Sequence, residues 1–352
     1  MTAPPTPDLR DVLAAARLPA ADELAWALRH LNGDGERPAE ATALWKLKTN
    51  VYRVELTADA AVHSVVLKSC NPALARRNTL VARRWLPAIG LPDAGARLLG
   101  TAGDRRGERT WLIFEDLGEG TLQATMGDAG RVEAVVDLVA ALHARSARHA
   151  VLPECRHHGA DLGGAYFTAN VLDAIRGLEQ LRPRRVSLSP EQADIRDRVL
   201  VRLRVLANEF PSRLRRLAES GGPDVLLHGD LWTTNAFVTD GPRGPRARLV
   251  DWDHAGVGPM AYDLSTLLLR FPAERRPAIL DGYRAALTAA GGWTLPSTSV
   301  LNGLFETAEC ARYANRAVWP AVALLVDKAD WAFDELAMVA DWFEALHPVL
   351  PE

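Results

Sequence analysis

The sequence predicts an α+β protein in which an antiparallel sheet is followed by a larger, mostly helical region. Between residues 43 and 69 apolar and polar residues alternate with the period of two that half-buried strands show. Between residues 94 and 115 two short apolar segments flank a charged turn, which predicts two more strands. Beyond residue 130 the apolar residues recur at helical spacing. The 352 residues suffice for two domains or for one large one.

The elements follow in order along the chain. Two short helices are expected over residues 9–16 and 24–31, before three strands with the sequences LWKLK, VYRVEL and SVVLKS. A helix from residue 72 to 89 separates these from two more strands, ARLLG and TWLIF. Further helices are expected over 132–147, 165–181 and 191–218, and again from residue 263 to the end.

Composition excludes several classes of function. The net charge of −3 provides no electrostatic footprint for nucleic acid. No apolar run approaches the roughly 18 residues that span a bilayer, and the amino terminus MTAPPTPDLRD lacks the pattern of a secretory signal. The three cysteines, Cys70, Cys155 and Cys310, are odd in number and widely spaced, as expected of free thiols. We therefore expect a cytoplasmic protein with no nucleic-acid or membrane partner.

The stretch from residue 225 to 263 contains most of the candidate chemistry. Two short apolar strands, expected to form a hairpin, run into the polar segments HGDLWTTN (228–235) and DWD (251–253). An Asp and an Asn five positions apart, with a second Asp about twenty residues later, suit the positioning of a hydroxyl and the binding of Mg²⁺ at phosphate oxygens. Either segment alone would be an ordinary turn.

Together the two segments resemble the paired motifs of the aminoglycoside phosphotransferase family, which are small-molecule relatives of the protein kinases and are near the choline and ketosamine kinases. The resemblance implies a bilobal fold, with an N-terminal lobe over residues 1–115 and a catalytic and acceptor-binding lobe over 116–352. It implies that Asp230 is the catalytic base and that Asn235 and Asp251 bind the metal. His228 and Asp263 would support the catalytic loop.

The nucleotide half of the resemblance implies ATP, or GTP, bound between the lobes with Mg²⁺. Lys68 at the end of the third strand would bind the phosphates, with Thr49 and Asn50 in the preceding turn and the linker residues Glu115 and Leu117 at the base. Two features depart from the pattern. The turn has no glycine, and the helix after Lys68 has no acid to pair with it, since a threonine, Thr79, stands where the glutamate is expected. Either another carboxylate orients Lys68 or the ion pair is absent.

The acceptor pocket is expected in the helices after residue 263. Acidic residues outnumber basic ones there, which would favour a cationic acceptor, although exposed helices are commonly acidic. The candidate acceptor-binding residues combine acids with aromatic side chains that would stack on a ring or face a cation, although aromatics at helical spacing are usually part of a core. These candidates are Asp253, Glu306, Glu309, Tyr313 and Trp319.

Three functions are consistent with these residues. The first is a phosphotransferase that modifies a hydroxyl of a natural product, such as an antibiotic, and so confers resistance. The second is a metabolic kinase for an amino alcohol, a sugar or a ketosamine. The third is a nucleotide-binding pseudokinase, which the missing helix acid and the glycine-free turn would suit.

Overall fold

The computed structural model describes residues 9–31, 40–58, 61–181, 186–242 and 244–351. Its chain forms two compact units, each discontinuous in sequence. The first comprises Met1–Val135 and Thr234–Asp253, and the second comprises Val136–Thr233 and His254–Glu352. The sequence predicts a single boundary after Glu115, whereas the first unit extends past this residue.

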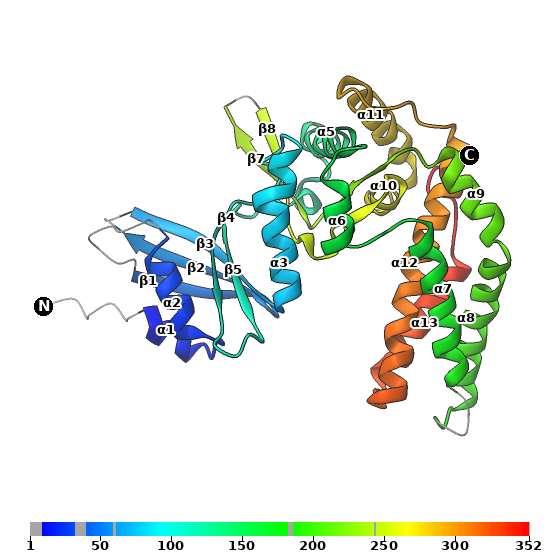
Figure 1. Cartoon of the computed structure of the whole chain (residues 1–352), viewed down its shortest axis with the longest axis horizontal. Coiled ribbons are helices and arrows are strands. Elements are labelled where there is room, and N and C mark those ends of the chain that lie inside the picture. Colours follow the sequence, from blue (N-terminus) through cyan, green and yellow to red (C-terminus); the bar gives the residue numbers. More distant parts are fainter. Residues whose placement is uncertain (1–8, 32–39, 59–60, 182–185, 243, 352) are drawn as a thin grey trace, which may run out of the picture. The chain divides into compact units, whose positions relative to one another are not determined.

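An antiparallel sheet forms the centre of the first unit (Figure 1). Within the described residues it has five strands in the order β1-β2-β3-β5-β4, each hydrogen-bonded to its neighbours. The predicted strands are therefore confirmed. Their bounds are β1 (Glu40–Lys48), β2 (Val51–Ala58), β3 (Ala61–Cys70), β4 (Leu98–Gly103) and β5 (Thr110–Glu115).

Alternation along the strands explains why helices cover both faces of this sheet. Trp111 and Ile113 pack with the apolar residues of α1 (Leu9–Ala15) and α2 (Ala21–Arg29). The alternate residues Leu112 and Phe114 pack with α3 (Pro72–Leu80) on the opposite face. The helix begins at Asn71, whose side chain accepts a hydrogen bond from the backbone of Leu74, and it continues through the π-helical turn Val81–Trp85 into α4 (Leu86–Ala88).

The strands that precede the two motifs do not form the predicted hairpin with each other. β6 (Asp224–Leu227) pairs with β9 (Gly256–Pro259) in the second unit. β8 (Gly244–Leu249) pairs instead with β7 (Ala236–Gly241), a strand that the prediction did not include. Backbone hydrogen bonds from Leu249 to Ala94 and from Val238 to Gly120, both 2.7 Å, attach the β7–β8 hairpin to the rest of the first unit.

Helices dominate the second unit, as predicted. The carboxyl-terminal part of α5 enters it, and α7, α8, α12 and α13 share an apolar core. The helices are α5 (Ala129–Ser146), α6 (Leu152–His158), α7 (Gly164–Gln180), α8 (Pro190–Asn208), α9 (Phe210–Ser220), α10 (Ala261–Leu268), α11 (Arg276–Ala289), α12 (Thr298–Val326) and α13 (Trp331–Glu344).

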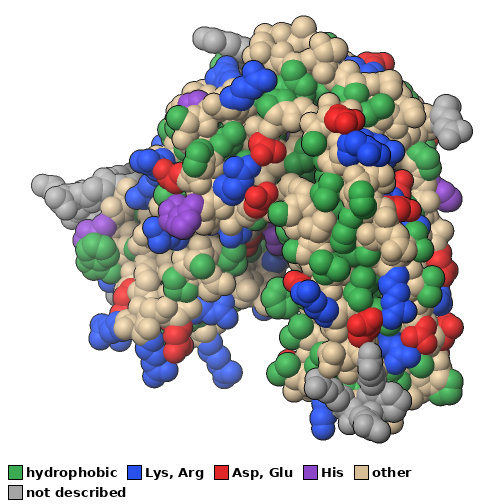
Figure 2. All heavy atoms as spheres, turned by 45° about the vertical axis from the view of Figure 1, so that its right-hand side comes forward, with side chains coloured by type: hydrophobic (Ala, Val, Ile, Leu, Met, Phe, Trp, Pro, Cys, Tyr) green, Lys and Arg blue, Asp and Glu red, His purple; other side chains and the backbone are tan. Residues whose placement is uncertain are grey.

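Charged side chains of both signs are interspersed over the face shown in Figure 2. In the part of the chain that the structure describes, no helix combines the length and the apolar character needed to cross a membrane. Cys70, Cys155 and Cys310 are free and buried, which confirms the prediction of free thiols.

Candidate functional site

A cavity of about 390 Å³ lies wholly within the first unit. Its walls are mainly apolar, and they include Val66 of β3, Phe114 of β5 and Phe237 of β7. Polar groups also line it, and they include the predicted residues Lys68, Glu115, Asn235 and Asp251. The predicted residue Leu117 belongs to the apolar part of the lining. An apolar cleft of this size with a few convergent polar groups is typical of a small-molecule site.

Lys68 is held by two carboxylates of the DWD segment. Its Nζ lies 2.5 Å from Oδ1 of Asp251 and 2.6 Å from Oδ1 of Asp253. Burial alone would lower the pKa of Lys68, but the two carboxylates outweigh it and the pKa is raised, so the ammonium group remains charged. The carboxylate that the α3 sequence lacks is thus supplied by residues 251 and 253.

Asn78 of α3 completes this arrangement, although it was not among the predicted site residues. Its side-chain amide donates a hydrogen bond of 2.7 Å to Oδ1 of Asp253, and Arg77 donates to the backbone carbonyl of Asp253. Thr79, the residue at the expected glutamate position, bonds instead to the carbonyl of Ala75 in its own helix. We name the set Lys68, Asn78, Asp251 and Asp253 the lysine clamp.

Of the other residues predicted to bind the nucleotide, those in the turn after β1 do not line the cavity, whereas the residue at the end of β5 does. Thr49 and Asn50 form an exposed turn beside the cavity residues Lys48 and Val51 without lining the cavity themselves. The carbonyl of Asn50 accepts a hydrogen bond of 2.8 Å from the backbone of Ser69, so its backbone stabilises the end of β3.

Glu115 does line the cavity. Its carboxylate pairs with Arg248 and accepts a 2.7 Å hydrogen bond from the backbone N–H of Arg97. Its side chain therefore connects β5, β8 and the segment before β4 within the first unit.

The oxygen donors in this cavity fit a magnesium ion. The side chains of Asn235 and Asp251 both line it, and amide and carboxylate oxygens are the hard ligands that Mg²⁺ prefers. Asp251 adopts a φ of 67°, a left-handed conformation that is unusual for a residue other than glycine and is found at functional sites. Among the described residues no group of three or more His, Cys, Asp and Glu could hold a metal. Mg²⁺ is commonly bound by one or two carboxylates together with substrate phosphates and water.

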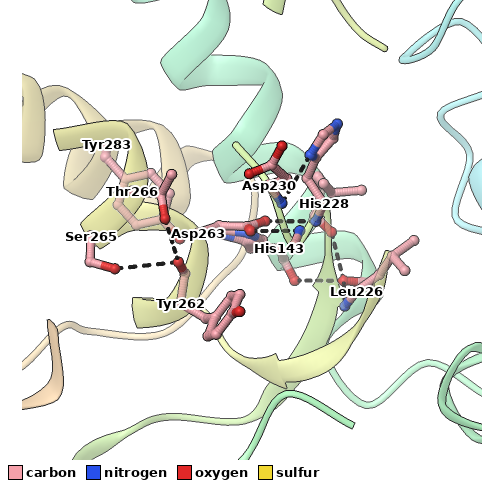
Figure 3. Close-up of polar contacts among 12 residues, drawn as sticks. His143, Leu226, His228, Asp230, Tyr262, Asp263, Ser265, Thr266 and Tyr283 are labelled. Carbon is pink, nitrogen blue, oxygen red and sulfur yellow. Dashed lines mark hydrogen bonds and ion pairs between the residues drawn. The ribbon is translucent and has the colours of Figure 1, made fainter. Parts of the chain in front are cut away.

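The second unit holds Asp230 in a loop after β6. Buried Asp263 of α10 fixes this loop by accepting hydrogen bonds from the backbone N–H groups of His228 (2.7 Å) and Gly229 (2.9 Å), as Figure 3 shows. The Nδ1 of His228 accepts a 3.3 Å hydrogen bond from the backbone of Asp230. Hydrogen bonds from His228 and Gly229, the two residues before Asp230, to the buried carboxylate of Asp263 therefore fix the backbone of this loop.

A buried network supports Asp263 in turn. The Nε2 of His143 lies 3.5 Å from its carboxylate, and the Nδ1 of His143 lies 2.8 Å from the hydroxyl of Tyr283 (Figure 3). Burial alone would raise the pKa of Asp263, yet His143 and the backbone donors outweigh it and hold the pKa below its usual range. Asp263 is thus a stable anion at neutral pH.

Asp230 lines a second cavity, of about 360 Å³, which lies wholly within the second unit. Of the five residues predicted to bind the acceptor, Trp319 also lines it. The other four lie elsewhere: Asp253 is in the lysine clamp, Glu306 pairs with Arg213, Glu309 accepts from Ser265, and Tyr313 stacks on Trp342. The sequence contained a signal for one overlooked cavity residue, Trp232, because it stands within the HGDLWTTN segment.

Comparison with known proteins identifies this arrangement at the level of family. Residues 40–298 match the model of the phosphotransferase enzyme family. A comparison with curated proteins gives no match.

Solved structures show the same fold at low identity. An aminoglycoside phosphotransferase from Streptomyces rimosus, in complex with ADP and streptomycin, is 16% identical with a TM-score of 0.52, over 85% of this chain and 98% of that one. An ethanolamine kinase from Plasmodium vivax is 13% identical with a TM-score of 0.57, over 88% and 82% of the two chains. A spectinomycin phosphotransferase in complex with ADP and spectinomycin is 11% identical with a TM-score of 0.52, over 88% and 94%. The kinase-like fold predicted from the two motifs is confirmed.

Proposed function

We propose, on the premise that this chain belongs to the phosphotransferase enzyme family, that it transfers the γ-phosphate of ATP to a hydroxyl group of a small molecule. The observation that carries this proposal is the cavity of the first unit, where a charged lysine, an Asn and an Asp line one apolar cleft. These are the groups that phosphoryl transfer requires, because the protein contributes mainly position and electrostatic stabilisation.

In this proposal each polar residue has one task. Asn235 and Asp251 hold Mg²⁺, which supplies positive charge to the phosphate oxygens when it is bound. Lys68 neutralises the α- and β-phosphates, and Asp253 is the positioning residue that orients it. Asp230 orients the acceptor hydroxyl and accepts its proton, while Asp263 holds the loop that presents Asp230.

The lysine clamp favours an active kinase over a pseudokinase. The helix acid is missing, but a carboxylate lies 2.6 Å from the ammonium of Lys68 and is itself hydrogen-bonded to α3 through Asn78. Consumption of ATP that depends on an acceptor separates these two functions, because a pseudokinase would bind nucleotide without turnover.

For the acceptor, we propose a natural product such as an antibiotic, with a metabolic alcohol as the alternative. Similar solved structures include phosphotransferases in complex with streptomycin and spectinomycin, and also an ethanolamine kinase. Resistance conferred on a sensitive host would favour the first function, and phosphorylation of amino alcohols without resistance would favour the second. GTP in place of ATP, in the same turnover assay, tests the choice of base.

Replacement of Asp230 by alanine tests the catalytic assignment. We expect turnover to fall by roughly 10²- to 10⁴-fold, because general-base catalysis is lost while the nucleotide cavity is unchanged. Turnover is measured as ADP release with a saturating acceptor, and nucleotide affinity by calorimetry. Asp173→Ala, at an exposed aspartate that pairs with Arg176 on α7, is the control and should keep full activity. Full turnover in Asp230→Ala would overturn the assignment.

A further inference from the structure

The side chains around the cavity at Asp230 indicate the charge and the shape of the acceptor, which the net charge of the whole sequence does not. It is formed by the catalytic loop, α7, α10, one face of α12 and the start of α13. Its lining residues on α12 recur at the spacing of a single helical face. The cavity is lined by Tyr166, Gly229, Asp230, Trp232, His254, Tyr262, Arg312, Asn315, Arg316, Trp319, Pro320, Trp331 and Glu335.

The charges in this cavity do not suit a polycation. Its two carboxylates are Asp230 and Glu335, and Glu335 already pairs with Arg316 at 2.9 Å. The second lining arginine, Arg312, lies with its guanidinium carbon 4.1 Å from the ring centroid of Tyr262 and donates hydrogen bonds to the carbonyls of Gly229 and Tyr262. A cationic acceptor would therefore meet two guanidinium groups, each with a carboxylate neighbour, and no lining carboxylate other than the proposed base Asp230 and the one paired with Arg316.

Two acids of the carboxyl-terminal helices have partners within the second unit. Glu306 pairs with Arg213 at 2.6 Å. Buried Glu309 accepts a 2.6 Å hydrogen bond from the hydroxyl of Ser265 and lies 3.6 Å from the guanidinium of the cavity residue Arg312. Neither residue lines the cavity. The acidic character of this region is thus not presented to an acceptor.

A third arginine, Arg270, does not line the cavity but stacks on Trp232, which does. The guanidinium carbon of Arg270 lies 4.1 Å from the ring centroid of Trp232. Within the described part of the chain, the Nε of Arg270 is buried and makes no hydrogen bond. A carboxylate near this wall would be attracted to Arg270, and an ammonium group would be repelled.

Exposed aromatic rings complete the recognition surface. Trp319 and Trp331 are 65% and 55% exposed, and Trp232 is 38% exposed. Large apolar rings at a cavity wall remain this exposed at a cost in hydration, which a stacked planar ligand would remove. We term Trp232, Trp319 and Trp331 the tryptophan wall.

We infer that the acceptor is a hydroxylated compound with a planar, apolar ring system and with a neutral or carboxylate-bearing character, and that it is not a polycation. This inference rests on the proposed function, which places the acceptor hydroxyl at Asp230. The rings stack on the tryptophan wall, where Trp232 already carries the guanidinium of Arg270, and the positive charge of the arginines selects against a cationic acceptor.

A panel of matched compounds tests the charge preference. A 4-hydroxyphenyl alkanamide, the matching carboxylate and the matching amine present one ring and the same phenolic hydroxyl, and kanamycin serves as a polycationic probe. Binding is measured by calorimetry with ADP and Mg²⁺ present, and transfer is measured separately as acceptor-dependent ADP release. We expect the neutral compound and the carboxylate to bind at least about 10-fold more tightly than the amine.

Single substitutions test which side chains cause the preference for ring compounds and the preference for charge. Trp319→Ala should weaken binding of the ring compounds about 10-fold without changing the KM for ATP, because one stacking partner is lost. Arg270→Gln should reduce the preference for the carboxylate over the amine. Trp26→Ala, at a tryptophan that is 64% exposed on α2 of the first unit, is the control and should change neither quantity.

The outcomes distinguish this inference from the proposed function. Tighter binding and faster phosphorylation of the amine or of kanamycin would overturn the charge class and leave the phosphotransferase function standing. Binding of the neutral and anionic rings without any phosphorylation would support the charge class and count against the function. If no ring compound bound the native protein more tightly than it bound Trp319→Ala, the inference would be wrong.

Discussion

Asp253 acquires its role from neighbours that are distant in the sequence. Its carboxylate contacts Lys68 of β3 and Asn78 of α3, which lie 185 and 175 positions away in the chain. In this position a single carboxylate connects a strand, a helix and the DWD segment of the first unit. The ion pair that kinases commonly form from a helix has its acid on the DWD segment here.

Replacement of Asp253 by alanine should lower kcat/KM for ATP by about 10- to 100-fold, because Lys68 loses one of its two anchors and the phosphates are less well positioned. Steady-state kinetics at varied ATP would measure this loss. A second change, Asn78→Glu in the same chain, places a carboxylate on α3 and should restore part of the activity. Thr79→Ala is a control on the same helix, since its hydroxyl bonds only to its own helix, at Ala75, in the described structure. No recovery on adding Asn78→Glu would show that Asp253 does more than orient Lys68.

The ionisation of the Asp263 carboxylate should make the stability of the fold depend on pH. Its pKa is depressed in the folded protein, so its contribution to stability is complete above the unfolded pKa of about 3.9 and is lost as pH falls through that value toward the folded pKa. Asp263→Asn should lower the free energy of unfolding at pH 7 by about 3 kcal/mol, because buried backbone donors lose an anionic acceptor.

Urea unfolding between pH 7 and pH 3, followed by circular dichroism, measures both effects for Asp263. The native protein should lose stability over this range more steeply than Asp263→Asn. Equal pH dependence in the two proteins would contradict the assignment.

At the scale of elements, the loop between β6 and Asp230 depends on a close approach that only glycine allows. Gly229 has a φ of 81°, and a Cβ atom at this position would lie 2.0 Å from the carbonyl oxygen of His254. Both residues belong to the second unit, where β6 pairs with β9. The loop that carries Asp230 therefore has no room for any other residue at 229.

Gly229→Ala should destabilise the protein by more than about 3 kcal/mol, because a steric clash adds to the cost of the left-handed conformation. Gly291→Ala is a matched control in the same unit, with a φ of 76° and no heavy atom within 4 Å of the added Cβ. It should cost only about 1 kcal/mol. Thermal unfolding of both variants gives the difference, and equal costs would show that the clash is relieved by movement of the loop.

At the scale of the whole molecule, bound nucleotide should stabilise the fold. A ligand at 100 times its Kd adds about 2.7 kcal/mol to the free energy of unfolding. Thermal unfolding with ATP should therefore show a higher Tm in the presence of Mg²⁺ than in the presence of EDTA. Asp251→Ala should lose this magnesium-dependent part. An identical response to Mg²⁺ in Asp251→Ala and in the native protein would remove Asp251 from the metal site.

Local patterns were sufficient to predict the fold. Alternation around Val54 and a short apolar run around Ile113 predicted the strands. The HGDLWTTN and DWD segments predicted the kinase-like class because their residue types and spacing are specific. The pairing of β6 with β9 could not be predicted in the same way. Short strands carry no local signal for their partner, and the additional strand β7 changed the pairing.

In the candidate site, too, local sequence patterns predicted some residues and could not predict their distant partners. Lys68 and Asp251 were identified from their positions in motifs, and the structure places them 2.5 Å apart. Asn78 was overlooked, because an asparagine within a helix has no sequence pattern that indicates a distant carboxylate. The acceptor region appeared acidic because sequence counts charges without their partners, and Arg213 of α9 neutralises Glu306 of α12.

The tryptophan wall also makes the protein its own optical reporter. Trp319 and Trp331 are more than half exposed to solvent, so their indole emission is sensitive to a change in local polarity. An acceptor that covers them would shift that emission to shorter wavelength before any phosphate is transferred. Libraries of unlabelled compounds can therefore be titrated by fluorescence, with Trp319→Phe to assign the signal.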